Sequence, residues 1–395
     1  MSAAVEFRGV DIIFGDDKQV AAALPMLDSG VDRAEMLEKT GAVLGCAGCD
    51  LTVEQGEISV LMGLSGSGKS TLLRAVNGLN KVTRGEVTVH DGDWHADVVT
   101  CSADELRKIR RECVAMVFQQ FALLPWRTVA ENVGFGLELA GVPAKEREER
   151  VARQLELVHL DQWAKKYAHE LSGGMQQRVG LARAFATEAP ILLMDEPFSA
   201  LDPLIRTKLQ DELIELQARL KKTILFVSHD LEEALKIGNR ITIMEGGRIV
   251  QTGTPEEIVL SPANDYVRDF IANVNPLSVL TAWNVMRDVR DLETAGDGWL
   301  WLDRRQTTRF QLDRNGLVIG AERNERPAMW TSCDPLETLP PDAHPVYWAK
   351  PGTPLRLVMH AMHQSHTAPV AIFDEQSRFL GAIGVRDVLK AILRR

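Results

Sequence analysis

The stretch GLSGSGKST, Gly63 to Thr71, decides the fold of this 395-residue chain. It follows an apolar run, Ile58 to Met62, which has the composition of a buried strand. After it, apolar residues recur at helical spacing: Leu72, Leu73, Val76 and Leu79. A glycine-rich loop between a strand and a helix is the context in which such a loop binds a nucleotide phosphate. The sequence therefore predicts an α/β fold built around a phosphate-binding loop.

The residue types in this loop fit phosphate chemistry. Glycines allow backbone N–H groups to curl around a β-phosphate, Lys69 would reach the β- and γ-phosphates, and the Ser70 hydroxyl would coordinate Mg²⁺. The predicted nucleotide-binding residues of the loop are Gly63, Ser65, Gly66, Ser67, Gly68, Lys69, Ser70 and Thr71.

Two further apolar strands end in polar residues that suit hydrolysis. ILLMD, Ile191 to Asp195, is followed by Glu196. Because Mg²⁺ prefers hard oxygen ligands, Asp195 is its predicted partner, and Glu196 is the residue able to polarise an attacking water. The strand TILFVSH ends in His229, a predicted contact of the γ-phosphate. The helical run between these strands predicts a parallel crossover, and ITIMEGGRIVQ predicts a hairpin turned at Gly246–Gly247.

Composition excludes several classes of protein. The net charge of −10 argues against a general nucleic-acid binder, because no basic excess exists to replace the counterions of phosphates. No window approaches the roughly 18 apolar residues of a membrane span, and the first residues lack a secretory pattern, so we expect a cytosolic chain. Its five cysteines fit a reducing compartment, and Cys46 and Cys49 are expected as reduced thiols near a strand.

A second stretch, LSGGMQQ from Leu171 to Gln177, also has the pattern of an anion site. Its serine and glycines precede a helical run whose apolar face is Met175, Val179, Ala182 and Ala186. The chain thus carries two loops suited to phosphate, and only the first of them contains a lysine.

Residues 55 to 260 resemble the ATP-binding cassette of ABC transporters. Six motifs occur in the order of that family: the phosphate loop, Gln119 in VFQQFALLP, the signature LSGGMQQ, the strand ILLMDEP, the SALD segment ending at Asp202, and His229. The resemblance implies a P-loop NTPase with a mixed sheet core, an antiparallel β subdomain and a helical signature subdomain over about 119–185. The cassette would span 1–275.

The resemblance also implies the roles of residues. Glu196, His229 and Gln119 would be catalytic, and Ser70, Gln119 and Asp195 would hold Mg²⁺. In this family two cassettes dimerise head to tail, and the signature loop of one covers the ATP of the other. On this basis the nucleotide-binding residues also include Ser172, Gly173, Gly174, Gln176 and Asp202.

Phe14, in IIFGDD, is the predicted adenine-stacking residue, although a helical insert of residues 18–41 separates it from Gly63. That insert resembles the quaternary-amine branch of the family, the importers of choline, glycine betaine and proline betaine. LEKTGAVLG and FALLPWRTVAENVGFGLEL look most like its choline-transport members. The predicted function is therefore an ATPase that energises choline import. Glycine betaine or proline betaine import is the alternative, and a soluble ABC ATPase acting on nucleic acid is the alternative from another class.

The expected partners follow from this resemblance. A homodimer would sit under two copies of a membrane permease, at the cytoplasmic face of the inner membrane, with the region from Gln119 to about 170 docking the permease. An extracytoplasmic substrate-binding protein would take part indirectly, and no nucleic-acid partner is expected. Chromosome ATPases with this signature carry long coiled coils, translation-type ATPases carry two cassettes, and exporters usually carry membrane spans. The sequence shows none of these features.

Residues 276–395 are predicted to be a regulatory region. Within 340–395, the stretch Ala368 to Leu393 is similar to a single cystathionine-β-synthase-type (CBS) repeat, giving a small α+β domain. The residues before 340 have only a vague likeness to a second repeat. In the last helix an apolar stripe is expected to pack in a core, with a membrane-surface contact as the alternative; the stripe is Val385, Val388, Leu389, Ile392 and Leu393.

Overall fold

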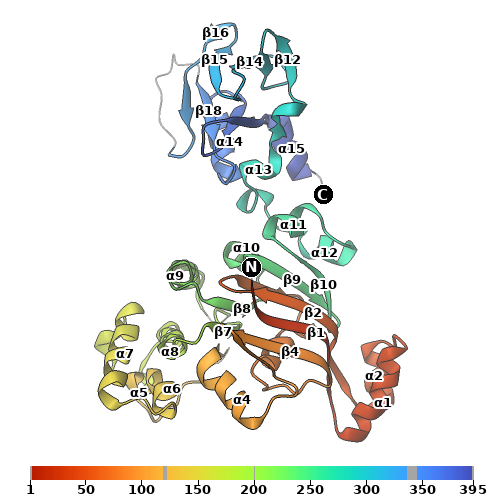
Figure 1. Cartoon of the computed structure of the whole chain (residues 1–395), viewed down its shortest axis with the longest axis vertical. Coiled ribbons are helices and arrows are strands. Elements are labelled where there is room, and N and C mark those ends of the chain that lie inside the picture. The colour runs from red at the N-terminus through yellow and green to blue at the C-terminus, as the bar shows by residue number, and fades with distance from the viewer. Residues whose placement is uncertain (1, 119–121, 200, 336–344, 394–395) are drawn as a thin grey trace. The chain divides into compact units, whose positions relative to one another are not determined.

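The computed structural model describes residues 2–118, 122–199, 201–335 and 345–393. The chain divides into two compact units, Met1–Pro255 and Glu256–Arg395 (Figure 1). The division falls before residue 275, the boundary predicted from composition. Helices α11 (Pro255–Leu260) and α12 (Asp265–Phe270) account for the difference, because Leu260 packs against the apolar core of the second unit.

A six-stranded sheet forms the centre of the first unit, in the order β10-β9-β3-β8-β7-β6. Its strands are β3 (Ile58–Met62), β6 (Val114–Val117), β7 (Ile191–Asp195), β8 (Thr223–Val227), β9 (Arg240–Glu245) and β10 (Arg248–Gly253). The strands are parallel except β10, which pairs antiparallel with β9. Every residue of β3, β7 and β8 is buried, as expected for parallel strands covered on both faces. The predicted crossover through α9 (Pro203–Leu220) and the predicted hairpin are confirmed.

An antiparallel sheet lies beside this centre, in the order β2-β1-β4-β5. Its strands are β1 (Ala3–Phe14), β2 (Val43–Glu54), β4 (Arg84–Asp91) and β5 (Trp94–Asp97). Residues of this sheet share one apolar core with the central sheet and with α3 (Lys69–Ala75), the helix that follows the phosphate loop. The predicted antiparallel subdomain is thus present, and the common core fixes it against the loop.

Helix α3 is shorter than the apolar spacing predicts. Leu72, Leu73 and Val76 are fully buried, but Leu79 is 53% exposed. The expectation for Leu79 is wrong because the helix ends at Ala75, and the chain then turns so that the Leu79 N–H bonds the Arg74 carbonyl.

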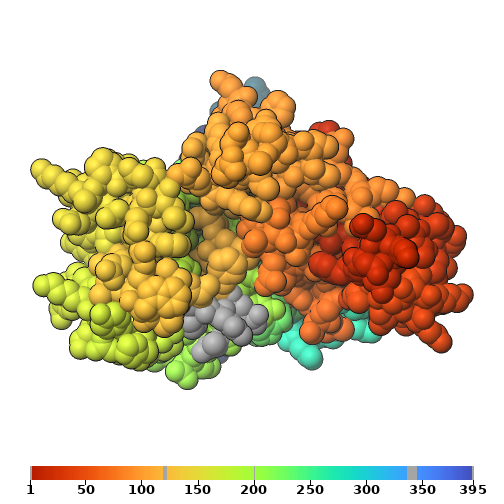
Figure 2. Space-filling view, turned by 90° about the horizontal axis from the view of Figure 1, so that it is seen from below, coloured from red at the N-terminus to blue at the C-terminus, as the bar shows by residue number. Residues whose placement is uncertain are grey.

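A separate apolar cluster holds the helical part of the first unit together (Figure 1). Its helices are α5 (Val129–Val133), α6 (Phe135–Leu139), α7 (Ala144–Leu157) and α8 (Gly173–Ala186). Val179, Ala182 and Ala186 of α8 are buried in this cluster and Met175 packs against it, which confirms the predicted apolar face. In Figure 2 this part forms a yellow lobe at one side of the unit.

The insert forms two helices, α1 (Asp17–Asp28) and α2 (Arg33–Thr40), close to the predicted range. Asp16 caps α1 and Asp32 caps α2, each accepting a backbone N–H bond. Met36 is fully buried in a small cluster with residues of β1 and β2. In Figure 2 the insert, in red, lies at the side opposite the helical lobe.

Two sheets make up the second unit. The first, in the order β11-β20-β19-β18-β17, combines parallel and antiparallel pairs: β11 (Arg287–Asp288), β17 (Trp330–Ser332), β18 (Val346–Ala349), β19 (Val370–Phe373) and β20 (Phe379–Ile383). The second is an antiparallel meander: β12 (Glu293–Gly296), β13 (Trp299–Trp301), β14 (Thr308–Leu312), β15 (Val318–Arg323) and β16 (Arg326–Pro327). The meander occupies the segment that has only a vague likeness to a second repeat.

The remaining helices of the chain are short. They are α4 (Ala103–Lys108), α10 (Leu231–Ile237), α13 (Ala282–Val285), α14 (Leu355–Gln364) and α15 (Val385–Leu393). In α15 only Val388 is buried, whereas Leu389 is 49% and Leu393 74% exposed. The expectation of a fully packed stripe is therefore wrong, because the core of the unit covers only one side of this helix. Within the described ranges no helix combines the length and apolar character that a membrane crossing requires.

We predict that Met36→Ala opens the insert. The lost packing should destabilise α1 and α2 by about 2–3 kcal/mol, so their amides should exchange hydrogen faster than in the unaltered chain. Leu37→Ala, which alters a neighbouring residue that is 47% exposed, is the matched control. Equal exchange rates in the two variants would show that Met36 does not hold the insert in place.

Candidate active site

The phosphate loop depends on glycines at its turns. Gly63, Gly66 and Gly68 all have positive φ, at +143°, +78° and +104°. A Cβ on Gly68 would lie 2.6 Å from the Gly45 carbonyl oxygen and 3.4 Å from Cα of Gly247. No side chain fits there, so the strand β2 and the β9–β10 turn approach the loop only because this residue is glycine.

Lys69 lies inside the loop. It is the first residue of α3, and its Nζ donates to the carbonyls of Gly63 at 2.9 Å and Leu64 at 3.0 Å. Burial lowers the pKa of Lys69, while the carboxylates of Glu196 and Asp195 act in the opposite direction. The ammonium group is thus held next to the backbone that would surround a phosphate.

Ser67 offers an unused polar atom in the same place. Its Oγ is buried and has no hydrogen-bond partner among the described residues. A buried polar group without a partner costs stability unless a ligand or water satisfies it. Together with the inward Lys69, this orphaned hydroxyl shows that the loop fits an anionic group such as a phosphate.

Asp195 connects the end of β7 to the helix after the loop. Its carboxylate accepts a hydrogen bond from Ser70 Oγ at 2.6 Å and an ion pair from Arg74 Nη2 at 2.7 Å, and its side chain is 1% exposed. The structure thereby brings together the two described residues predicted to share Mg²⁺. The role of Arg74 was not predicted, although its position four residues after Ser70 places both on one face of a helix.

Glu196 and His229 lie together at the neighbouring strand ends. Glu196 has a left-handed backbone, with φ of +47°, and its N–H donates to the Val227 carbonyl at 3.1 Å. Non-glycine residues in this conformation concentrate at functional sites, where surrounding bonds hold them. Glu196 Oε2 is 3.5 Å from His229 Nδ1. The predicted base and the predicted γ-phosphate contact are therefore adjacent.

The donors present are suited to Mg²⁺. Among the residues that the structure describes, no three or more His, Cys, Asp and Glu side chains gather as a metal site. The predicted ligands are instead the Ser70 hydroxyl and the Asp195 carboxylate, which are hard oxygens and touch one another. The third predicted ligand, Gln119, lies outside the described residues.

Phe14 is close to the loop in spite of the insert. A Cβ built on Gly45 would lie 2.9 Å from Phe14 Cε2 and 2.8 Å from Thr71 Cγ2, so the ring and the threonine methyl converge on one point. The insert does not separate Phe14 from the loop, because it connects the end of β1 to the start of β2. Phe14, the last residue of β1, pairs with Val43, the first residue of β2. Phe14 is 42% exposed, so part of this residue remains accessible to a ligand.

The signature residues do not reach the phosphate loop of their own chain. Ser172 caps α8, accepting from the Met175 N–H, and the position of a Cβ on Gly173 is open space. Gln176 donates instead to the carbonyls of Ala168 and Leu171, within its own loop. Asp202 begins α9 without a side-chain cap bond and is exposed. Within the described ranges, no hydrogen bond or ion pair joins these residues to Gly63–Thr71.

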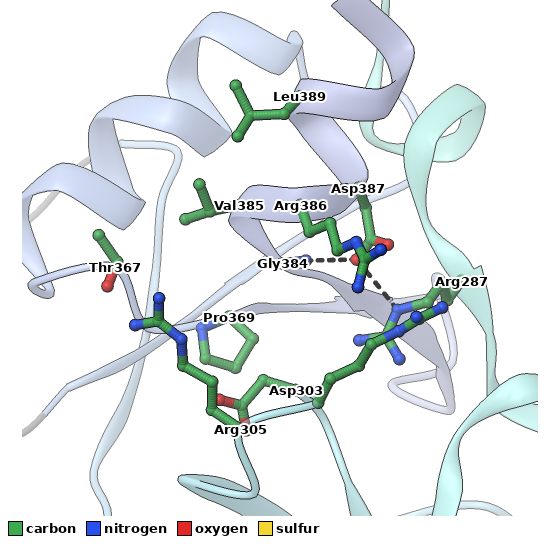
Figure 3. A pocket seen from close by; sticks show the side chains of 11 residues that line it. Arg287, Asp303, Arg305, Thr367, Pro369, Gly384, Val385, Arg386, Asp387 and Leu389 are labelled. Carbon is green, nitrogen blue, oxygen red and sulfur yellow. Dashed lines mark hydrogen bonds and ion pairs between the residues drawn. The ribbon is translucent and has the colours of Figure 1, made fainter.

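A second cavity lies in the C-terminal unit, with a volume of about 440 Å³ (Figure 3). Four arginines line it: Arg287, Arg304, Arg305 and Arg386. The carboxylate of Asp387 accepts from Arg287 and from the Gly384 N–H, as Figure 3 shows. The other three arginines form no hydrogen bond or ion pair with the described residues. Asp303 also lines the cavity, and its carboxylate accepts from Thr307 and Thr308. With two carboxylates against four arginines, the described lining has an excess of positive charge.

Comparison with known proteins agrees with this geometry. Residues 46–199 match the ABC transporter family, and residues 342–394 match the CBS domain. The glycine betaine/proline betaine transport system ATP-binding protein ProV of Escherichia coli is 43% identical over 403 residues, covering 100% of this chain and 98% of that protein. The glycine betaine transport ATP-binding protein OpuAA of Bacillus subtilis is 50% identical over 72% of this chain and 66% of its own length.

A solved structure shows the same fold. The dimeric ATP-binding cassette MJ0796, bound to ADP and phosphate in a post-hydrolysis state, aligns with 64% of this chain and 98% of its own, at 31% identity and a TM-score of 0.53. The predicted P-loop cassette with a C-terminal CBS domain is confirmed. The chain therefore belongs to the ABC transporter ATPases, in the group that includes the glycine betaine transport ATP-binding proteins.

Proposed function

We propose that this chain hydrolyses ATP to energise import of glycine betaine, proline betaine or a closely similar quaternary amine. The observation that carries the proposal is the full-length similarity to ProV, which includes the insert and the C-terminal unit. This favours the betaine alternative over the expectation of choline. A relative whose name includes choline, the glycine betaine/carnitine/choline transport ATP-binding protein OpuCA of Bacillus subtilis, aligns with 56% of the chain and is named for glycine betaine as well.

The proposed mechanism assigns each step to residues of the site. The loop amides, Lys69 and the orphaned Ser67 hydroxyl would bind the β- and γ-phosphates, and the exposed face of Phe14 would stack on the adenine. Mg²⁺, held by Ser70, Asp195 and Gln119, would supply positive charge against the phosphate oxygens. Glu196 would orient the attacking water and accept its proton.

His229 would complete the site on the γ-phosphate side. Its ring is 3.5 Å from Glu196 and its side chain is 55% exposed, so it can contact both this carboxylate and a bound nucleotide. The bond between the Glu196 N–H and the Val227 carbonyl supports this arrangement, because it keeps the acid beside the end of β8, where His229 follows.

We further propose a head-to-tail homodimer. Ser172, Gly173 and Gly174 form an exposed helix start that lacks bonds to the phosphate loop of the same chain, and such a start attracts an anion. A partner copy would place this start over the ATP of the first chain. The proposal is supported by the solved cassette MJ0796, which is a dimer.

The helical lobe is the proposed docking region for the permease. Large apolar side chains are exposed there: Trp126 (72%), Leu139 (59%), Trp163 (39%) and Tyr167 (42%). Exposed aromatic groups of this kind are typical of protein interfaces. Docked in this way, the chain would be peripheral at the cytoplasmic face of the membrane and would act on a substrate delivered by an extracytoplasmic binding protein.

We expect Glu196→Gln to trap an ATP-bound dimer, because the amide keeps the shape of the side chain but cannot accept the proton of water. Size-exclusion chromatography of the full chain in MgATP should show a dimer for this variant and a lower dimer fraction for the unaltered protein. A monomeric Glu196→Gln protein that binds ATP would contradict the split-site arrangement.

Transport in cells tests the substrate. In cells that lack this gene, the unaltered gene should restore uptake of labelled glycine betaine or proline betaine, and Glu196→Gln should not. Labelled choline is measured in parallel. Restoration of choline uptake alone would return the assignment to choline, and restoration of none of the three would refute the quaternary-amine proposal.

The C-terminal unit is proposed to be regulatory. The cavity of Figure 3 supports this, because Arg304, Arg305 and Arg386 have no ion-pair partner among the described residues. The exposed apolar residues Val385 and Leu389 line its wall. Unpaired arginines in one cavity favour a small anion with more than one charge. Val385 and Leu389 of the α15 stripe thus belong to this cavity wall, whereas the exposed Leu393 is not among its lining residues.

We predict that added sulfate changes the ATPase rate through this cavity. The rate of the full chain, measured at constant ionic strength with chloride replaced by sulfate, should respond in the unaltered protein and should not respond in the double variant Arg304→Gln/Arg305→Gln. Arg290→Gln, which removes an exposed arginine paired with Asp288, is the control and should respond normally. Equal responses in all three would exclude the cavity as the sensor.

A further inference from the structure

The insert contributes one side chain to the phosphate loop. Arg33, the first residue of α2, donates from Nη1 to the carbonyl oxygen of Gly66 at 2.5 Å. No short sequence pattern predicts this contact, because the two residues are 33 positions apart and lie in different elements. It links the insert directly to the middle of the loop that is suited to phosphate.

The contact fixes the orientation of one loop amide. In a planar trans peptide the C=O and N–H groups point in opposite directions, so a donor that holds the Gly66 carbonyl also directs the N–H of Ser67. That N–H faces the inside of the loop, where it meets the Leu64 carbonyl at 3.1 Å. The following carbonyl, of Ser67, accepts from the Gly247 N–H at 3.1 Å. Two successive carbonyls of the loop are therefore held by donors from the insert and from the β9–β10 turn.

Arg33 is itself held in position. Asp32 caps the start of α2 by accepting the Glu35 N–H at 2.9 Å, and Met36, less than one turn along the helix, is fully buried. At the end of α1, Asp28 pairs with Arg84 at 2.8 Å. Because the insert is anchored at these points, little conformational entropy remains to be lost when Arg33 acts on the loop.

The charge of Arg33 is not neutralised by a carboxylate. No described acidic residue forms an ion pair with it. A hydrogen bond with Cys49 and burial raise the pKa of the neighbouring Cys46 thiol, and the Arg33 charge, as a smaller effect, lowers it. Cys46 Sγ lies 3.5 Å from the Gly68 carbonyl.

We propose that Arg33 is a positioning residue for the nucleotide phosphates. It orients the Gly66–Ser67 peptide and adds uncompensated positive charge beside the loop, so that the insert strengthens binding of nucleoside diphosphates and triphosphates. This inference rests on the proposed function of the loop in binding ATP. It gives the insert a part in nucleotide binding that the cassette motifs do not contain.

The test compares three variants of the full chain: Arg33→Met, Arg33→Lys and, as control, Lys39→Met. Lys39 lies on the same helix and pairs with Glu35, away from the loop. ATP, ADP and AMP are each titrated against a fluorescent ATP analogue in the presence of Mg²⁺.

Arg33→Met should weaken ATP and ADP binding about tenfold, the effect of a lost charge-assisted hydrogen bond. AMP binding should not change, because AMP has no β-phosphate. Arg33→Lys should retain part of the affinity, and Lys39→Met should retain all of it.

Steady-state hydrolysis gives a second measure. For Arg33→Met, KM for ATP should rise about tenfold with kcat changed by less than about twofold, since the residue acts on binding.

Equal loss of ATP, ADP and AMP binding would mean a general structural role and would overturn the proposal. An Arg33→Met protein with the ATP affinity of Lys39→Met would overturn it as well. If Arg33→Met does not fold, Met36→Ala, which loosens the same helix, must show the same selective loss. An unaltered chain that binds no ATP would refute the proposed function instead.

Discussion

Close approach of backbone to the phosphate loop is the constraint on which the rest of the structure depends. The carbonyl of Gly45 and the turn at Gly247 lie where a side chain at Gly68 would be, and the carbonyl of Met244 lies 2.2 Å from the position of a Cβ on Gly63. The loop is therefore enclosed by β2 and by the β9–β10 hairpin. These contacts fix the antiparallel sheet and the hairpin relative to α3, which carries Lys69 and Ser70.

The same enclosure sets the electrostatics of the site. Lys69, Arg33 and Arg74 bring three positive groups to the loop and its helix, and Asp195 and Glu196 bring two negative groups to the ends of the strands. Arg74 is engaged with Asp195, and Lys69 with backbone carbonyls. The arrangement has a strongly polar centre within an apolar core. Such a centre is stable because its polar groups have partners. Among the described residues of the loop, Ser67 Oγ is buried without a hydrogen-bond partner, and a ligand is expected there.

Distance in the sequence has little bearing on which residues meet. Phe14 and Thr71 converge on Gly45, and Arg33 reaches Gly66, because the insert leaves and rejoins an antiparallel pair of strands that stays paired up to Phe14 and Val43. An insert at this place can add a functional side chain without disturbing the strands, since its apolar residues pack around Met36 against the adjoining residues of β1 and β2. The meander of the second unit also adds side chains to a site built by other elements. Its Asp303–Arg305 turn contributes two arginines to a cavity that is otherwise lined partly by α15, the final helix of the CBS match.

The sequence alone predicts the elements that depend on residues lying close together in the chain. The phosphate loop, the acidic end of β7, the β9–β10 hairpin and the helices of the insert follow from residue types at short spacing, because glycine, proline and apolar periodicity act within a few residues. The tertiary structure alone decided that Arg74 would pair with Asp195, that Arg33 would meet Gly66, and that Leu79 and the outer side of α15 would be exposed. It also placed the division between the units at the first residue of α11, because Leu260 packs with the second core. These outcomes depend on which surfaces meet after folding, and short-range patterns carry no information about that.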